Sequence, residues 1–331
     1  MNKKRRKWVI LTTILLIIIL LLLKAFCPDG QQSAEGEGNS VITMEALMPS
    51  GTLYKYYEDP CTLACDLALE VQEQGETVQI LGVSLTEDYT ETSQKTILAT
   101  YQNSPEIQQT IYNWPRHHIT QYAAFSDDMV YCLTRQYDGG TKWFLERSNR
   151  MNGASLCCDI SDYLLEDRPI ALGYLPSDNL AVLTQDSVFI FNTIGDIRAI
   201  LKHKGINTSL CYDNNGNLLV SNVNDKGLQI YTIDAYTFTS TAVLNFSQDF
   251  TDYSLLGSNV PTYAFFLIRN DTLIGVNLDS GKLTELLNWN VLGLDPTSLD
   301  TLISRNDGTF LAAYLQEASS QCGFINIVPI G

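Results

Sequence analysis

From about residue 41 onward, apolar and polar residues alternate in short runs that predict β-strands separated by tight turns. The clearest unit covers residues 213–239. Within it, residues 218–220 form an apolar run typical of a buried strand, and residues 228–233 alternate apolar with polar side chains, as a half-buried strand does. Residues 224–227 supply Asn, Asp and Gly, which favour a turn because they tolerate positive φ or bond to their own backbone. The pattern predicts two antiparallel strands joined by a tight turn.

Variants of this unit recur at roughly 35 to 50 residues, the spacing at which four-stranded blades repeat around a propeller axis. The sequence therefore predicts an all-β, six-bladed β-propeller. A seventh blade is the alternative, if residues 41–75 form a blade of their own instead of a closing strand. We expect residues 41–57 to close the ring by pairing with the last blade, which holds Phe310 and Phe324. The six blades are expected near residues 77–113, 120–160, 169–202, 206–246, 253–288 and 298–328.

The first 24 residues follow a different pattern and predict one membrane-spanning helix. A basic tail at residues 1–7 precedes an apolar run at residues 8–23, which Lys24 ends. Sixteen helical residues reach about 24 Å, which crosses a hydrocarbon core of about 30 Å when the flanking basic side chains snorkel. Because no small-x-small cleavage pattern follows, we expect an uncleaved anchor over residues 8–24, with the tail in the cytoplasm and the bulk of the chain outside the plasma membrane.

The segment after the anchor predicts a linker. Residues 28–40 are rich in Gly, Gln, Glu and Ser and lack large apolar side chains, so residues 25–40 are expected to be a flexible tether for an extracytoplasmic domain at residues 41–331. Cys27 offers an alternative, because a cysteine just after an apolar run can be the lipid-attachment site of a bacterial lipoprotein. Lys24 and Phe26 depart from that pattern. Both alternatives tether the chain to the membrane.

Charge narrows the choice of partners. The chain carries 37 acidic and 21 basic residues, and six of the basic residues flank the apolar run, so the remainder has a balance of −22. Such a domain repels phosphate backbones, which argues against nucleic-acid binding. A basic or neutral partner is expected instead.

The residues that carry chemistry form no catalytic motif. The three histidines are His117, His118 and His203, and none lies near a serine or cysteine in a pattern that implies a nucleophile. Adjacent side chains on a strand point to opposite faces, so His117 and His118 share a metal only from an irregular loop. The turn at Asp213 lacks the Glu that ends a calcium-binding loop, since Asn224 occupies that position. We therefore predict no catalytic residue, no metal and no cofactor.

Eight cysteines leave the disulfide pairing open. Cys61 and Cys65 are close enough in sequence for a local bridge, and the adjacent pair at residues 157–158 allows a strained vicinal one. Cys132 and Cys211 lie in apolar runs and are interpreted as small buried hydrophobic residues.

Two resemblances rest on short motifs. The sequence Asp213-x-x-Gly216-Asn217 with the strand at residues 218–220 resembles the repeat hairpin of NHL and WD-type propellers. The region from about residue 41, notably residues 286–308, is similar to the propeller segment that precedes a solute-binding domain in some surface lipoproteins of Firmicutes. The resemblance implies a propeller associated with solute uptake.

Two functions remain open. The first is a non-catalytic, membrane-tethered module that binds a protein, peptide or glycan. The alternative is a propeller hydrolase of lactonase or glycosidase type, with acidic residues meeting at the axis. Its candidate residues occupy equivalent turns of different blades, where each is also interpreted as an ordinary turn residue. They are Asp127, Asp178, Asp213 and Asp307.

Overall fold

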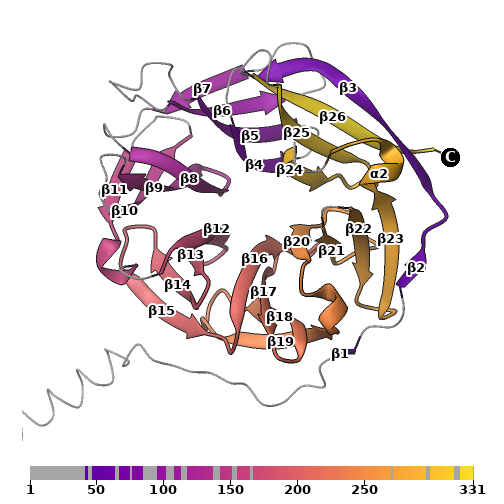
Figure 1. The fold of residues 1–331 in the computed structure, drawn as a ribbon. Coiled ribbons are helices and arrows are strands. Elements are labelled where there is room, and N and C mark those ends of the chain that lie inside the picture. The colour runs from indigo at the N-terminus through magenta and orange to yellow at the C-terminus, as the bar shows by residue number, and fades with distance from the viewer. Residues whose placement is uncertain are drawn as a thin grey trace, which may run out of the picture.

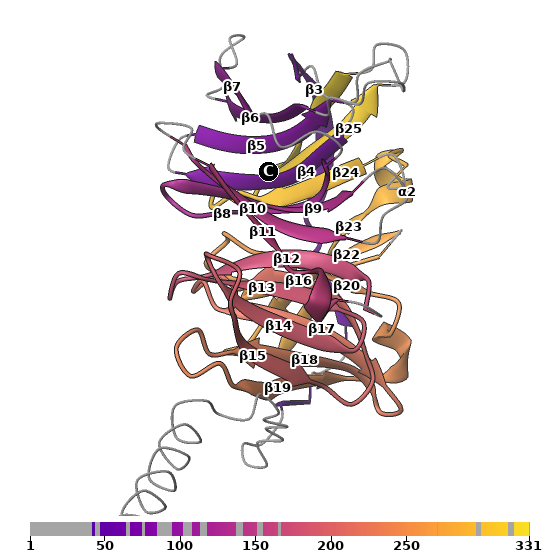
Figure 2. The ribbon, with the colours of Figure 1, turned by 90° about the vertical axis from the view of Figure 1, so that its left-hand side faces the viewer.

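The described residues of the computed structural model form six β-sheets arranged in a ring, with their first strands around a common axis (Figure 1). Consecutive strands within a sheet pair antiparallel, so each sheet is a meander that runs outward from the axis. Figure 2 shows the ring from the side. This is the architecture of a β-propeller. The structure describes residues 42–43, 47–63, 67–74, 77–84, 95–101, 108–112, 118–136, 142–150, 155–164, 167–269, 271–295, 299–316 and 321–330.

Blades 1 to 3 each have four strands. Blade 1 contains β4 (Leu67–Gln74), β5 (Thr77–Ser84), β6 (Lys95–Tyr101) and β7 (Gln108–Tyr112). Blade 2 contains β8 (His118–Phe125), β9 (Met129–Gln136), β10 (Trp143–Asn149) and β11 (Ser155–Asp159), followed by the short helix η1 (Ser161–Tyr163). Blade 3 contains β12 (Pro169–Leu175), β13 (Asn179–Thr184), β14 (Ser187–Asn192) and β15 (Ile197–Lys202).

Blades 4 and 5 have a fifth strand from the N-terminal part of the chain. Blade 4 contains β16 (Ile206–Tyr212), β17 (Leu218–Asn224), β18 (Gly227–Ile233) and β19 (Ser240–Phe246), with β1 (Ile42–Thr43) outside and η2 (Gln248–Phe250) following. Blade 5 contains β20 (Ser254–Gly257), β21 (Phe265–Ile268), β22 (Thr272–Asn277) and β23 (Lys282–Asn288), with β2 (Leu47–Pro49) outside and α2 (Trp289–Leu292) following. Blade 6 contains β24 (Leu299–Ser304), β25 (Phe310–Gln316), β26 (Gln321–Ile330) and β3 (Leu53–Leu63).

The ring closes through the pairing of the two ends of the domain. Strand β3 pairs antiparallel with β26, with Tyr57 opposite Asn326, which confirms the expected closing strand. Before it, β1 and β2 pair in parallel with β19 and β23. Strands β1, β2 and β3 therefore lie on the outside of blades 4, 5 and 6 in turn (Figure 1). This arrangement covers edge strands that would otherwise be open to pairing with other chains.

The seven-bladed alternative is wrong, because residues 41–75 do not form a sheet of their own. Their strands join four different blades, and β4 is the inner strand of blade 1. Gln74 of β4 pairs with Thr77 of β5, so blade 1 begins at Leu67 and not near residue 77. The expectation that residues 41–57 form one closing strand also needs correction, since β3 begins only at Leu53.

The predicted membrane helix at residues 8–24, the linker at residues 25–40 and Cys27 lie outside the described residues. Within the part of the chain that the structure describes, no helix is long and apolar enough to cross a membrane.

Hydrophobic side chains fill the spaces between neighbouring blades. Between blades 2 and 3, for example, Leu133 and Trp143 pack with Val182 and Phe191. Similar clusters lie between blades 3 and 4, 4 and 5, and 5 and 6. Blade 3 is covered on both faces, and its second and third strands, β13 and β14, are buried along their whole length. The blades therefore stack into one ring of cores that holds the inner strands in place.

Candidate functional site

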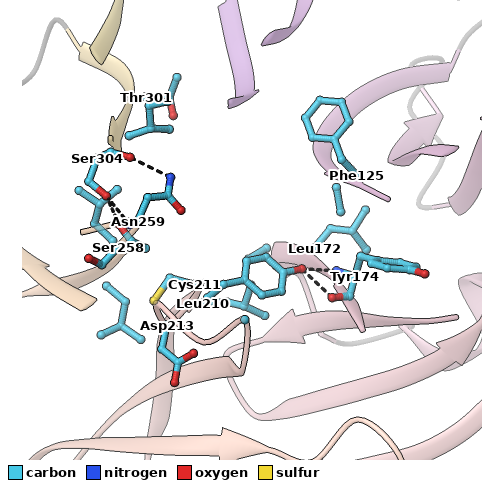
Figure 3. Close-up of a pocket in the computed structure, with 18 of the residues that line it drawn as sticks. Phe125, Leu172, Tyr174, Leu210, Cys211, Asp213, Ser258, Asn259, Thr301 and Ser304 are labelled. Carbon is cyan, nitrogen blue, oxygen red and sulfur yellow. Dashed lines mark hydrogen bonds between the residues drawn. The ribbon is translucent and has the colours of Figure 1, made fainter. Parts of the chain in front are cut away.

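The inner strands of blades 2 to 6 surround an axial cavity of about 590 Å³ (Figure 3). A volume of this size falls in the range of small-ligand pockets, about 300–1,000 Å³. The cavity opens among the first strands of the blades, where a propeller brings residues from distant parts of the sequence to one radius. Its described lining comprises Tyr122, Ala123, Ala124, Phe125, Ala171, Leu172, Tyr174, Pro176, Leu210, Cys211, Tyr212, Asp213, Asn214, Gly216, Leu255, Leu256, Gly257, Ser258, Asn259, Thr301, Leu302, Ile303 and Ser304.

Gly257 lacks a side chain and so lets the inner strands of blades 4 and 5 approach each other. A Cβ atom added to Gly257 would lie 3.1 Å from the backbone oxygen of Tyr212, closer than ordinary contact. Nearby, the backbone nitrogen of Leu255 donates a 2.8 Å hydrogen bond to Ser209 Oγ of β16. The two strands are thus fixed side by side at the cavity wall.

Two further sets of hydrogen bonds tie inner strands together. The Tyr212 hydroxyl of blade 4 donates to the Tyr174 carbonyl of blade 3 at 2.8 Å and accepts from the Tyr174 backbone nitrogen. Asn259, just after β20, donates from its backbone nitrogen to Ser304 Oγ and from Nδ2 to the Ser304 carbonyl, both at 2.8 Å. The Asn259 amide oxygen takes no part in these bonds and turns away from Ser304 (Figure 3). The wall is therefore pre-formed before any ligand arrives.

The aromatic part of the wall is uncharged. The Tyr174 ring stacks on Tyr131 with 5.5 Å between ring centroids, and its hydroxyl donates to Asp178 Oδ1 at 2.7 Å. Burial raises the pKa of Tyr174, and the hydrogen bond to Asp178 raises it further. Burial also raises the pKa of Tyr122, on the inner strand of blade 2. Both phenols stay protonated at neutral pH.

Asp213 is the charged residue among the described lining residues, and its carboxylate is bound by its own turn. Oδ1 accepts from the backbone nitrogens of Asn215 and Asn217 at 2.9 and 2.8 Å, and Oδ2 accepts from Asn217 Nδ2 at 2.9 Å. These bonds hold the tight turn between β16 and β17. In this position Asp213 is a turn residue that also contributes surface to the cavity.

The other three predicted aspartates lie at equivalent turns but do not line the cavity. Asp307 Oδ1 accepts from the backbone nitrogen and hydroxyl of Thr309, and Asp178 accepts from Tyr174. Asp127 is exposed, and its backbone carbonyl accepts from Arg150. The four carboxylates thus do not meet at the axis. Across the described residues, the cluster of potential metal ligands that does form belongs to blade 2.

The described histidines and cysteines lie in different environments in the structure. His203, in the connection between β15 and β16, is half-buried against blade 4, between Asn207 and Ser240. His118 lies on β8, while His117 lies outside the described residues. Cys132 and Cys211 are buried at 0% and 7% exposure, which confirms their interpretation as core residues. The two adjacent cysteines of β11 are both free thiols, so no vicinal disulfide joins them.

Sequence reasoning missed the wall residues Asn259 and Ser304. They are separated by 45 residues and lie on successive blades, so no local pattern joins them. Their position along the chain could have indicated them. Both lie where an inner strand ends, and at these points successive blades present side chains to the axis.

Comparison with solved structures shows the same overall fold at very low identity. A predicted exported protein of Bacteroides fragilis superposes with a TM-score of 0.53 at 10% identity, covering 88% of this chain and 100% of that chain. A luciferin-regenerating enzyme superposes with a TM-score of 0.50 at 9% identity, covering 85% and 96%. A predicted gluconolactonase gives 0.48 at 16% identity, covering 86% and 95%. Identities of this size show the fold alone.

No protein-family model and no curated protein matches the sequence. The resemblance to the propeller segment of Firmicutes solute-binding lipoproteins is therefore without support from a family match. The described residues define a β-propeller with an axial cavity.

Proposed function

We propose that this propeller is a non-catalytic binding module that takes an uncharged segment of a peptide or glycan into its axial cavity. The predicted helix at residues 8–24 would tether it outside the membrane. One observation carries the proposal: the cavity has the size of a ligand pocket, yet its one described charged side chain, Asp213, is held by its own turn. A site of this kind offers shape, aromatic surface and neutral hydrogen-bonding groups.

The groups at the wall suit an uncharged ligand. Asn259 and Thr301 present amide and hydroxyl groups on one side, and the aromatic rings of Phe125 and Tyr174 lie on the other (Figure 3). Aromatic rings beside neutral polar groups are a common way to bind sugar faces and uncharged side chains, because no charge has to be desolvated without a partner. Catalysis would additionally need a nucleophile, base or metal held against the ligand. The described lining does not bring such a set together.

A thermal-shift screen of the full chain in detergent tests the proposal. Neutral oligosaccharides and uncharged peptides should raise the melting temperature, because a ligand that binds only the folded state stabilises it. Matched anionic ligands, such as sugar acids and acidic peptides, should have a smaller effect because the domain is acidic. Lactone, glycoside and peptide substrates should show no turnover. Stabilisation by anionic ligands alone, or metal-dependent hydrolysis, would overturn the proposal.

A further inference from the structure

One face of blade 2 carries a buried polar cluster, whereas hydrophobic clusters lie between blades 2 and 3, 3 and 4, 4 and 5, and 5 and 6. The side chains of Leu133 and Leu145 point toward blade 3 and pack in its hydrophobic cluster. Because successive side chains alternate between faces, Thr134 and Glu146 point the other way, toward blade 1. Arg150 crosses the same interface by donating to the side chain of Gln79 on β5. The cluster therefore lies on the face of blade 2 that is turned toward blade 1.

Glu146 is the centre of this cluster. Its side chain is fully buried, and Oε1 lies 2.6 Å from His118 Nδ1 and accepts from Thr134 Oγ1 at 2.7 Å. The other carboxylate oxygen, Oε2, is buried without a hydrogen-bond partner. Burial raises the pKa of Glu146, while Thr134 and His118 lower it. A buried carboxylate with one free oxygen is costly unless something else binds it.

Cys157 completes a set of three potential metal ligands. It pairs with Glu146 across β10 and β11, so both side chains lie on the same sheet face. One donor atom each from His118, Glu146 and Cys157 lies within 4.8 Å of the other two. The imidazole of His118 is held in place by stacking on Phe144, with 4.0 Å between ring centroids. Cys157 reaches solvent, which provides an entry path for an ion.

We propose that His118, Glu146 and Cys157 bind a divalent transition-metal ion of the zinc class. Imidazole nitrogen, carboxylate oxygen and thiolate sulfur are the ligands that Zn²⁺ takes in proteins, and three protein ligands leave one position for water or another group. The thiolate and the carboxylate together carry two negative charges, which the ion neutralises. The ion also gives the buried carboxylate the partner that it lacks.

The same residues fit less well to a catalytic triad in which Cys157 would be the nucleophile. Cys157 reaches solvent, but partial burial of its thiol and the nearby Glu146 carboxylate raise the pKa of that thiol to about 12, which disfavours the thiolate that a nucleophile needs. A metal ion removes this difficulty because it displaces the thiol proton into solvent as the sulfur–metal bond forms. The metal interpretation therefore accounts for all three side chains.

Metal titration of the full chain tests the proposal. Protein stripped with a chelator should bind one Zn²⁺ per chain by calorimetry, and Co²⁺ in its place should give sulfur-to-metal charge-transfer absorption. Cys157→Ser should weaken Zn²⁺ binding at least tenfold and remove that absorption. Glu146→Gln should also weaken binding. The control is Cys158→Ser, which changes the neighbouring thiol on the opposite sheet face and should leave both signals intact.

Circular dichroism melts separate loss of the site from loss of the fold. Because Cys157 is exposed, its serine variant should fold, so its metal affinity decides the matter. Three outcomes overturn the proposal: no Zn²⁺ binding by the unmodified chain, unchanged binding by Cys157→Ser, or equal losses in Cys157→Ser and Cys158→Ser.

Discussion

The side-chain nitrogen of Asn259 donates to the backbone carbonyl of Ser304 at 2.8 Å, and the Ser304 hydroxyl accepts from the Asn259 backbone nitrogen at the same distance. This reciprocal pair joins blades 5 and 6 at the cavity wall (Figure 3). Ser304 is buried, at 1% exposure, and its hydroxyl also donates to the Gly257 carbonyl. The pair is thus both a structural tie and part of the proposed binding site.

Replacing Ser304 by Ala should lower the free energy of unfolding by about 1–3 kcal/mol, because it removes a buried hydroxyl together with its two hydrogen bonds, from the Asn259 backbone nitrogen and to the Gly257 carbonyl. Denaturant unfolding measures the loss. Ser280→Ala is the matched control, since Ser280 also bonds a side chain but is exposed at a turn of blade 5. The Ser280→Ala variant should change the free energy of unfolding by no more than about 0.5 kcal/mol. Equal costs for the two variants would contradict the role given to Ser304.

Asp213→Ala should destabilise the folded domain without removing an activity. The variant deletes a carboxylate that holds two backbone nitrogens and the Asn217 side chain, so we expect a loss of about 1–3 kcal/mol. Asp213→Asn keeps an oxygen in the Oδ1 position and should recover much of that loss. Chemical unfolding compares the two. A hydrolase with Asp213 at its active site would behave differently, losing turnover in both variants with stability unchanged.

His203 should make the domain less stable in mild acid. Its ring stacks on Tyr231 and bonds Asn207 and Ser240, all uncharged, and burial lowers its pKa in the folded state. The unfolded chain therefore binds a proton first as the pH falls below about 6.5. The contribution of His203 to the free energy of unfolding is fully present above that pH. It is lost as the pH falls through the lowered pKa of the folded state.

The comparison variant for this effect is His203→Gln. The unfolding free energies of the unmodified chain and of this variant should differ most at pH 7.5, and the difference should shrink toward pH 5. A difference that grows as the pH falls would show that the histidine binds its proton more tightly in the folded state, contrary to the account.

The turns and the closing strand could be predicted because their signals are local or topological. The Asp213 turn combines Asp, Asn and Gly in a few positions, and the structure places that turn between β16 and β17. The closing strand follows from the need of a ring to pair its ends, and β3 supplies it. By contrast, β1 and β2 pair in parallel with strands far along the chain, as Ile42 does with Leu244, and nothing near them in sequence marks those partners.

The sites were harder to predict because they depend on contacts between blades. Nothing in the local pattern distinguishes Glu146 from an exposed carboxylate on a strand, yet the sheet register and the neighbouring blade bury it. The axial aspartates were plausible because they occupy equivalent turns. Each of Asp178, Asp213 and Asp307 instead accepts hydrogen bonds near its own turn. Propeller symmetry predicts where residues recur but not which side chains reach the axis.

The binding affinity of a cavity-filling variant tests the central claim most directly. Calorimetry would use the neutral oligosaccharide or uncharged peptide that stabilises the full chain most. Asn259→Trp places a large ring at the cavity wall, and Val291→Trp places the same ring on α2, where Val291 is 82% exposed and outside the lining. We predict that the Kd rises at least tenfold for Asn259→Trp and is unchanged for Val291→Trp. An unchanged Kd for Asn259→Trp in a folded protein would contradict binding in the axial cavity.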